Sequence, residues 1–496
     1  MKGKIKLLSL LLALAMVASM FAACNNGGSE NNGGDTNEPV EIVWWHWGNP
    51  PKDTNTVVEA LNKMSAEDIG VTVKFNWATD NEQKLKTALS TGQKDDIAFT
   101  CAWFANYIST AQSGQLADLT EMLKQDEFQT LYKSMPEFFW EAATVDGKIY
   151  AVPTTKDSAA QNFWTVNKEY VIDTVGAQAE FDQVGTALST VTPLLRKIKS
   201  YVDNGGEPYP HDLTAPLNFN KSGLNGFEAA RWDMINGSIH IGDKLGDDGV
   251  KIISTFDDEE TLADYREMAM WRKEGLVNQD AQQIESELTY QVVSKAQGWE
   301  GAEAIWGNQK DYTVAIKAQH EPIASRATVI GSMNGIFANS EKKEEALKYL
   351  QYINTDKDYR NMLAFGIEGE NYELTEEGTI KTLNDQWAPG SFAQASTWIM
   401  TPAAPAAPDM YENVKEMSLN ATPTDLIGFT FVEESVKSEI AACTSIFQQY
   451  ASALACGAYE DADATIAEMM QKLEAAGYRK IIEECQKQVD EYMASK

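Results

Sequence analysis

The chain has 496 residues, of which 43% are hydrophobic and 23% are charged, and this ordinary globular composition excludes a disordered or collagen-like protein. It contains 41 lysines and arginines against 73 aspartates and glutamates, which gives a net charge of −32. Nucleic acids are bound through clustered basic residues, so this balance argues against a nucleic-acid partner. The length predicts two or more cores, either as separate domains or as two lobes of one protein.

The N-terminus is typical of a bacterial lipoprotein signal. Three lysines within the first six residues precede an unbroken run of apolar and small residues, 7–23, which ends directly before Cys24. The run is long for the apolar part of a signal peptide but short for a membrane span. Because small residues precede Cys24, we predict that 1–23 is removed and that Cys24 carries a lipid, although Phe21 stands where leucine is commoner. The alternative is an ordinary signal peptide with an incidental cysteine.

A polar segment follows the predicted lipid anchor. Residues 25–38 are rich in glycine and asparagine and contain no large apolar side chain, which predicts a flexible tether through 24–39. No later stretch of the sequence is apolar enough for a transmembrane helix. We therefore expect an exported protein that is anchored by lipid to the outer face of the cell membrane.

Strand and helix patterns alternate from residue 40 onward. Strands are predicted at 40–45, 71–77 and 95–103, with helices at 53–64 and 81–92 between them. This order predicts a parallel sheet with helices on its faces. Because ligands bind at the carboxyl ends of parallel strands, the segments that follow these three strands are candidate site segments.

The rest of the chain mixes the same patterns. A strand running into a helix is predicted at 161–171, and a further strand at 326–340 precedes a helix at 342–354. Three amphipathic helices separated at Gly457 and Gly477 end the chain. The four remaining cysteines have no metal-ligand spacing and are predicted to be free, buried thiols. They are Cys101, Cys443, Cys456 and Cys485.

Motifs of the common enzyme classes are missing from the sequence. It contains no GxSxG, HExxH or P-loop motif and no GxGxxG after a strand, which excludes the commonest hydrolase, zinc and nucleotide-binding classes. The acidic loop 242–249 places Leu245 where a calcium loop needs an oxygen ligand. We therefore expect no metal and no cofactor. The 73 acidic residues make some close carboxylate pair inevitable, so such a pair carries no weight as evidence for glycoside cleavage.

Aromatic and polar residues gather after the three predicted strands. Sugars present flat C–H faces that stack on aromatic rings, and their hydroxyl groups need polar partners, so this combination favours a sugar-binding wall. The predicted wall consists of Trp45, His46, Trp47, Asn49, Asp80 and Trp103. Two alternatives stay open: each tryptophan could instead pack in the core, and an aromatic cage could hold a quaternary ammonium group.

Several segments together resemble a known family. The start of the predicted body (VEIVWWHWGNPPKDTNTVVEALNKM, 40–64), DGKIYAVP (146–153) and the stretch from GSMNG to GIEGENYE (331–373) are similar to the extracellular solute-binding lipoproteins of ABC importers. This is the carbohydrate-type family 1, and the resemblance is greatest to its LplA-like branch. The sequence departs from the family pattern at His46-Trp47-Gly48 and Asn76-Trp77-Ala78. Both departures lie at the predicted ligand wall, so the identity of the ligand is not carried over.

The resemblance implies a two-lobed, periplasmic-binding-protein-like α/β fold with parallel-sheet lobes and a hinge. We expect an N-terminal lobe from 40–155 plus 325–360. The C-terminal lobe would comprise 156–324 plus 361–496, including a helical C-terminal module. The family captures carbohydrates, often oligosaccharides, between the lobes and delivers them to an ABC transporter permease. We expect a monomer that is not an enzyme.

The second lobe should supply the opposite wall of the binding site. Its candidate residues are Trp164, Trp232, Trp299 and Trp306, with Asn334 near the hinge. Two other functions are compatible with the sequence. The same scaffold could carry a peptide or a quaternary amine, or the protein could be a surface glycosidase.

Overall fold

A computed structural model describes residues 38–78, 81–159, 161–224, 227–286, 288–310 and 312–496. The predicted signal peptide, Cys24 and most of the tether lie outside the described residues. The chain divides into the units 1–38 and 39–496, and the helices and strands described below all belong to the second unit. Among the described residues, no helix combines the length and apolar character needed to cross a membrane.

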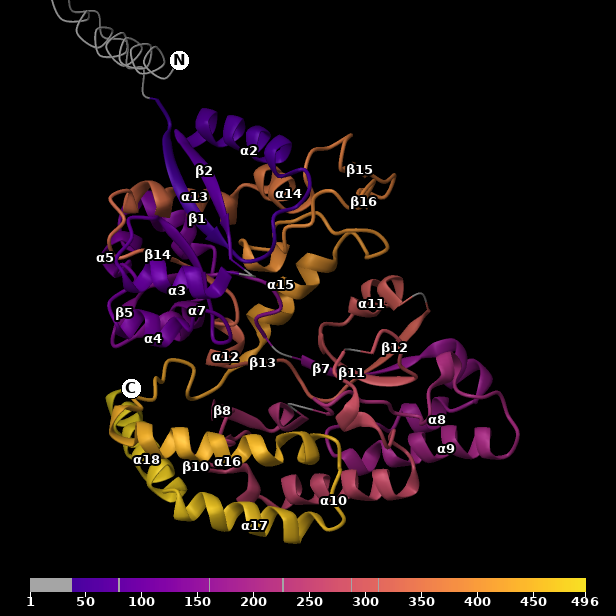
Figure 1. Ribbon diagram of the computed structural model, residues 1–496. Coiled ribbons are helices and arrows are strands. Elements are labelled where there is room, and N and C mark those ends of the chain that lie inside the picture. The colour runs from indigo at the N-terminus through magenta and orange to yellow at the C-terminus, as the bar shows by residue number, and fades with distance from the viewer. Residues whose placement is uncertain (1–37, 79–80, 160, 225–226, 287, 311) are drawn as a thin grey trace, which may run out of the picture. The chain divides into compact units, whose positions relative to one another are not determined.

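The first core is built on a mixed five-stranded sheet. Strand β1 pairs in parallel with β2 and β3, which confirms the parallel arrangement predicted for the first three strands. Strand β14 then pairs antiparallel with β3 and β6. Helices α2 and α13 pack on this sheet (Figure 1). In sheet order the strands are β2 (Val71–Trp77), β1 (Val40–His46), β3 (Ile97–Thr100), β14 (Met333–Ile336) and β6 (Ala151–Pro153).

Helices from two distant parts of the chain complete the first core. One group comprises α2 (Thr54–Ile69), α3 (Glu82–Ser90), α4 (Tyr107–Gln112), α5 (Thr120–Leu123), α6 (Gln129–Lys133) and α7 (Glu137–Ala143). The other comprises α13 (Lys343–Thr355), α14 (Lys357–Phe365) and α15 (Met410–Asn420). Two short hairpins, β4 (Thr144–Val145) with β5 (Lys148–Ile149) and β15 (Tyr372–Leu374) with β16 (Ile380–Thr382), lie beside these helices in the sequence.

Part of the expected C-terminal lobe belongs to the first core. The sequence placed 361–496 with the second lobe, but Leu363, Trp387 and Trp398 are buried in the first hydrophobic cluster. Arg360 explains why this segment stays there. Its guanidinium is fully buried and donates to the carbonyl oxygens of Ser396 and Ser391 at 2.8 Å each, so the loop after α14 is fastened to the first core.

The second core has antiparallel sheets, so the parallel arrangement expected for this lobe is wrong there. Strand β7 (Gln161–Asn167) lies between β11 (Val293–Gly298) and β12 (Val314–Ala318) and is antiparallel to both. A second sheet consists of β10 (Ile252–Ser254), β9 (Ile241–Lys244) and β8 (Trp232–Asn236). Its helices are α8 (Gln178–Phe181), α9 (Thr192–Asp203), α10 (Glu259–Glu274) and α11 (Ala302–Lys310).

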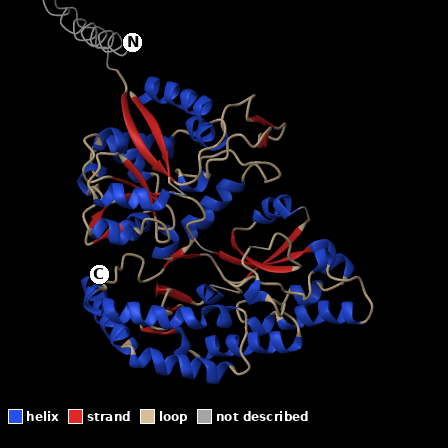
Figure 2. Ribbon diagram, in the orientation of Figure 1, coloured by secondary structure: helices blue, strands red, loops and turns tan. Residues whose placement is uncertain are grey.

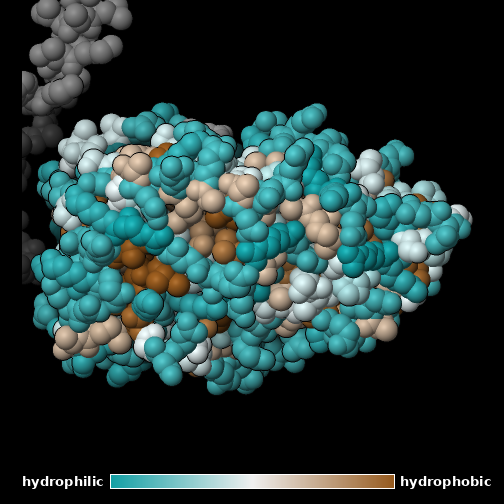
Figure 3. All heavy atoms as spheres, turned by 90° about the horizontal axis from the view of Figure 1, so that it is seen from below, coloured by the Kyte–Doolittle hydropathy of each residue, from teal (hydrophilic) through white to brown (hydrophobic). Residues whose placement is uncertain are grey.

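Three C-terminal helices pack mainly on the second core. Figure 2 shows these helices in blue at the C-terminal end of the chain. They are α16 (Lys437–Ala455), α17 (Ala462–Ala475) and α18 (Tyr478–Ser495). The predicted breaks at Gly457 and Gly477 are confirmed, since both glycines adopt a positive φ between helices. Hydrophilic residues cover most of the face seen from below (Figure 3), in keeping with the large net charge.

The two cores are joined by several passages of the chain. Strand β13 (Ile323–Ala324) pairs in parallel with β17 (Thr422–Pro423), and Ala159, Ala324 and Ala421 form a small buried cluster of their own. Helix α12 (Arg326–Val329) follows β13. The buried Arg326 donates to the carbonyl oxygens of Ala142 and Phe429, so it links the first core to the C-terminal segment.

The four described cysteines are free and buried, as predicted from their spacing. Burial raises the pKa of the Cys101 thiol to about 12 and that of Cys443 to about 11. These thiols therefore stay protonated and pack as small apolar side chains.

Candidate ligand-binding site

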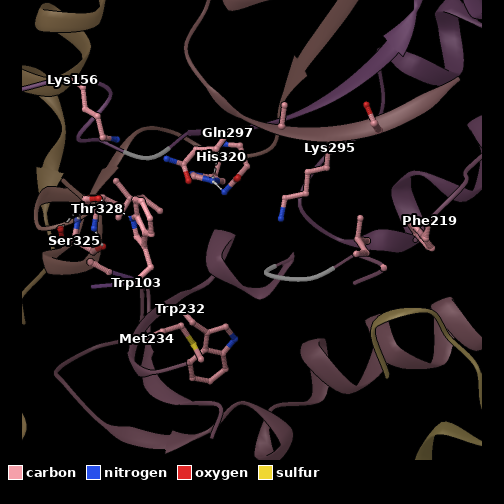
Figure 4. Close-up of a pocket in the computed structure, with 18 of the residues that line it drawn as sticks. Trp103, Lys156, Phe219, Trp232, Met234, Lys295, Gln297, His320, Ser325 and Thr328 are labelled. Atoms are coloured by element: carbon pink, nitrogen blue, oxygen red, sulfur yellow. Dashed lines mark hydrogen bonds between the residues drawn. The ribbon is translucent and has the colours of Figure 1, made fainter. Parts of the chain in front are cut away.

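A cavity of about 630 Å³ lies between the loop after β3, the segments that join the cores, and the sheets of the second core. Figure 4 shows side chains from all three sources around it. Its size suits a ligand of several sugar rings or another solute of that size. Representative lining residues are Trp103, Lys156, Trp232, Lys295, His320 and Ser325.

Trp103 supplies an exposed aromatic surface on the side of the first core. It follows β3 by three residues, and 54% of its surface is exposed, although it is a large apolar side chain. Its indole N–H donates to the carbonyl oxygen of Gly331 at 2.9 Å, which holds the ring in place. Trp47 packs edge-on against it at 6.1 Å between ring centroids. A fixed, exposed indole of this kind is suited to stacking against the C–H face of a sugar.

Strand β8 supplies apolar side chains on the opposite side. Trp232 and Met234 line the cavity and are separated by one residue, as expected for two side chains on one face of a strand. The indole N–H of Trp232 is already used, because it donates to the hydroxyl of Thr261 at 3.2 Å. Phe219 lies further along the same side (Figure 4). These residues offer ring edges and methyl groups to a ligand.

His320 is held in one neutral form beside the cavity. Its Nε2 accepts from the backbone N–H of Asn162 at 3.2 Å, so this nitrogen carries no proton. Nδ1 lies 2.7 Å from the carbonyl oxygen of Glu321 and therefore carries the proton and donates it. Burial lowers the pKa of His320 and reinforces the neutral form. The ring thus fixes Asn162 and brings no positive charge.

Two lysines carry the positive charge of the cavity. Lys156 follows β6, and its ammonium lies 2.7 Å from the carboxylate of Asp157. Lys295 extends from β11 into the cavity (Figure 4). Burial lowers the pKa of Lys295 to about 8, and the negative charge of Glu228 opposes this shift.

The C-terminal helices support one edge of the cavity. Gly223 and Leu224 line it, and the N–H of Leu224 donates to the carbonyl oxygen of Ala455, at the end of α16, at 3.0 Å. Gly223 has a φ of +54°, and a Cβ atom there would lie 2.0 Å from the same oxygen. Only glycine therefore allows this loop to approach α16 so closely.

The structure brings two of the predicted site residues together at the cavity, Trp103 and Trp232. Trp47 lies behind Trp103 rather than on the cavity surface. Asn49 is exposed in the turn after β1 and does not line the cavity. Asp80 lies outside the described residues.

Four predicted site residues are buried in the cores instead. His46 and Asn334 are enclosed in the first core, and Trp45 donates from its indole N–H to Asp95 at 2.6 Å. Trp164 is enclosed in the second core, where its indole N–H donates to the carbonyl oxygen of Gly185 at 3.0 Å. For these four positions the sugar-binding interpretation is wrong in this structure, because internal packing or hydrogen bonds already use the side chains.

Trp299 and Trp306 also lie off the cavity surface. Trp299 packs against the first hydrophobic cluster, and Trp306 packs at 6.3 Å from Phe163 between ring centroids. The ring of Trp306 also covers Gly298, where a Cβ atom would lie 2.6 Å from it. Both tryptophans support the strands and helices beside the cavity.

Comparison with known proteins identifies close similarity in sequence. The chain is 28% identical, over 510 aligned residues, to a carbohydrate ABC transporter substrate-binding protein of Streptococcus pneumoniae serotype 4 (strain ATCC BAA-334 / TIGR4), with 98% of this chain and 97% of that protein covered. The resemblance inferred from the sequence is confirmed. A lipoprotein of Bacillus subtilis (strain 168), LipO, is 21% identical over 408 residues, covering 77% of this chain and 76% of LipO.

Solved structures show the same fold. The N-glycan transport solute binding protein NgtS from Streptococcus pneumoniae matches with a TM-score of 0.81 at 25% identity, covering 92% of this chain and 99% of NgtS. Its complex with Man5GlcNAc matches with a TM-score of 0.72 over the same shares of the two chains. The chain thus has the two-lobed α/β fold of solute-binding proteins. Residues 425–494 match a family described as a domain of unknown function, DUF3502.

Most polar residues of the cavity were missed by sequence reasoning. Lys156 and His320 lie in segments that join the cores, and Lys295 lies on a strand of the antiparallel sheet. No local motif marks these three residues. The nearest signal was the pair of expected lobe boundaries, at 155–156 and 324–325, which lie close to Lys156 and His320 in the sequence.

Proposed function

We propose that the protein is the substrate-binding component of an ABC importer and that it captures an oligosaccharide in the cavity between the two cores. The observation that carries the proposal is the exposed indole of Trp103, which faces a cavity also lined by Trp232, uncharged polar groups and two lysines. Sugar binding combines stacking on aromatic rings with hydrogen bonds from polar side chains. Relatives named for carbohydrate and N-glycan transport support the same function.

Binding of a sugar between two lobes is coupled to a change in their separation. The ligand can shift the open–closed equilibrium only by its difference in affinity for the two forms. We extend the proposal to the partner: the closed form docks on the membrane permease of the importer. The family resemblance supports this step. The same resemblance supports the proposal that the protein acts as a monomer.

Attachment to the membrane through Cys24 completes the proposal. The apolar run before Cys24 and the polar tether after it support lipid anchoring, and the relative LipO is named a lipoprotein. Expression in a bacterium fed labelled palmitate tests this step. The wild-type protein should incorporate label, and Cys24→Ala should not.

A direct test measures thermal unfolding of the purified protein against a panel of oligosaccharides, choline, betaine and short peptides. A ligand that binds only the folded state stabilises it by about 2.7 kcal/mol at 100 times its Kd, which gives a readable shift in Tm. Stabilisation by a glycan supports the proposal. Stabilisation by an amine or a peptide alone, with no response to any glycan, would overturn the choice of sugar.

Substitution of Trp103 links binding to the cavity. Trp103→Ala should weaken binding of the identified glycan at least tenfold, about 1.4 kcal/mol, without lowering Tm in the absence of ligand. Trp103→Phe should restore part of the affinity because it keeps an aromatic face. Leu374→Ala is a matched control, since Leu374 is similarly exposed but lies in the β15–β16 hairpin, away from the cavity. Normal binding by Trp103→Ala would show that the sugar binds elsewhere.

A further inference from the structure

The charged side chains that line the cavity are opposite in sign to the net charge of the whole protein. The described residues that line it include two lysines, Lys156 and Lys295, but no aspartate or glutamate. Acidic residues outnumber basic ones by 73 to 41 in the sequence, so the charged residues of a lining taken at random would be mainly acidic. The positive cavity is therefore a local property of the residues that surround it.

The two lysines come from different elements and reach the cavity from different sides. Lys156 belongs to the segment after β6, whereas Lys295 belongs to β11 (Figure 4). The ammonium of Lys156 is close to the carboxylate of Asp157. The negative charge of Glu228 acts to raise the pKa of Lys295. Lys295 is the lysine that extends farther into the open space of Figure 4, so it is the one better placed to meet a ligand.

Burial of Lys295 has an energetic cost that a ligand can offset. Removing an ammonium group from water disfavours its charged form, and the lowered pKa of Lys295 reflects this cost. A negatively charged group on a ligand would stabilise the ammonium through a charge-assisted hydrogen bond. A neutral sugar hydroxyl would offset less of the cost of removing the ammonium from water.

The other polar groups of the cavity suit the remainder of a sugar. Asn162, Gln291, Gln297 and Ser294 are uncharged and can bind hydroxyl groups without repelling an anion. A lining carboxylate would act against an anionic ligand, and none is found among the described lining residues. The lining as a whole therefore discriminates by charge.

We propose that the cavity selects an acidic oligosaccharide, one that carries an oxyanion group such as a carboxylate or a sulfate, and that Lys295 binds this group. The proposal rests on the function proposed above and specifies the class of sugar. The charge of Lys156 is largely neutralised by its ion pair with Asp157, and Trp103 provides the stacking surface for the sugar ring.

Isothermal titration of the full chain with matched pairs of sugars tests the proposal. The pairs are sialyllactose with lactose, trigalacturonic acid with its methyl ester, and a sulfated lactose with lactose, and Man5GlcNAc is included as a neutral reference. At low salt, the acidic member of at least one pair should bind at least tenfold more tightly than its neutral counterpart. The difference should shrink as salt is added, because salt screens charge–charge attraction. The pairs with carboxylates and the pair with sulfate distinguish the two oxyanions.

Two lysine variants test whether Lys295 is responsible for the preference for acidic sugars. Lys295→Met keeps the length of the side chain and removes its charge, so it should reduce the acidic preference to about twofold or less. Lys317→Met is the matched control, because Lys317 is exposed on strand β12 of the same sheet and does not line the cavity. It should keep the full preference. The Tm of each variant without ligand checks that the variant is folded.

The possible results separate this proposal from the one it rests on. If no sugar of either kind binds, the proposed function is wrong. If Man5GlcNAc or the neutral members bind as tightly as the acidic ones, the function stands and the acidic selectivity is refuted. If the acidic preference persists in Lys295→Met, the anion is bound elsewhere and the assignment of Lys295 is refuted.

Discussion

Replacement of His46 by phenylalanine should make the protein more resistant to acid. His46 is fully buried at the end of β1, with the rings of Trp44 and Trp77 at 4.9 and 5.0 Å between centroids. Within the described residues, neither ring nitrogen has a hydrogen-bond partner. Burial is the main cause that lowers the pKa of His46 to about 3; the positive charge of Arg360 adds to this shift, and the backbone of Trp47 opposes it. A phenylalanine ring fills nearly the same space and cannot be protonated.

The size of the effect follows from the difference between the two pKa values. In the unfolded chain His46 has a pKa of 6.5, so it takes up a proton below that pH, whereas the folded protein resists protonation down to about 3. The unfolded state therefore binds more protons between these values, and stability is lost as the pH falls through this range. One pKa unit corresponds to about 1.36 kcal/mol, which gives a loss of about 2.5 kcal/mol between about pH 7 and about pH 4.5.

Urea unfolding followed by tryptophan fluorescence at these two pH values measures the loss. The wild-type protein should lose about 2.5 kcal/mol more than His46→Phe on acidification, and the two should differ little near neutral pH. His211→Phe is the matched control, because His211 is exposed and stacks on Tyr290 at 4.1 Å. It should keep the wild-type loss. Equal losses in the wild-type protein and His46→Phe would refute the reasoning.

Three further substitutions test the supports of the fold by the same urea assay. Arg360→Met should destabilise the protein by about 3 kcal/mol or more, because it leaves several buried oxygen acceptors unpaired, and an unchanged midpoint would contradict this role. Gly223→Ala should cost about 2 kcal/mol and also weaken ligand binding, since its Cβ atom would meet the carbonyl oxygen of Ala455; normal binding would separate this loop from the site. Trp44→Phe should cost about 1–3 kcal/mol, because the indole N–H that donates to Asn334 at 3.0 Å is lost; a smaller change would show that this side chain finds another partner.

Local patterns in the sequence were sufficient for the first two strands of the first core. The alternating residues of 71–77 and the apolar run from residue 40 correspond to strands β2 and β1, because both strands pair with neighbours that are close in the sequence. The same period of two also explains the error at His46. Trp44 and His46 are two residues apart and lie on one face of β1, so the burial of Trp44 carries His46 into the core with it.

Long-range pairing explains what the sequence could not predict. Strand β7 pairs with β11 and β12, which lie more than a hundred residues later, and no local pattern indicates such antiparallel partners. The sequence therefore contained no local signal that Lys295 would line the cavity. Trp103 lines the cavity because it follows a strand of the parallel part of the sheet, the position from which the sequence proposed it as a site residue. Asn334 was misplaced because β14 enters the middle of that sheet, where the Asn334 side chain is enclosed.

The dependence of the cavity edge on α16 has a consequence for the order in which the cavity is completed along the chain. The residues that contact Gly223 and Leu224 lie within the last part of the chain, and so does Phe429, which contacts Arg326. A nascent or truncated chain that lacks this part cannot complete the edge of the cavity, however well its first core has folded. Such a chain would therefore have an open cavity edge at Gly223 and Leu224, even with Trp103 in place.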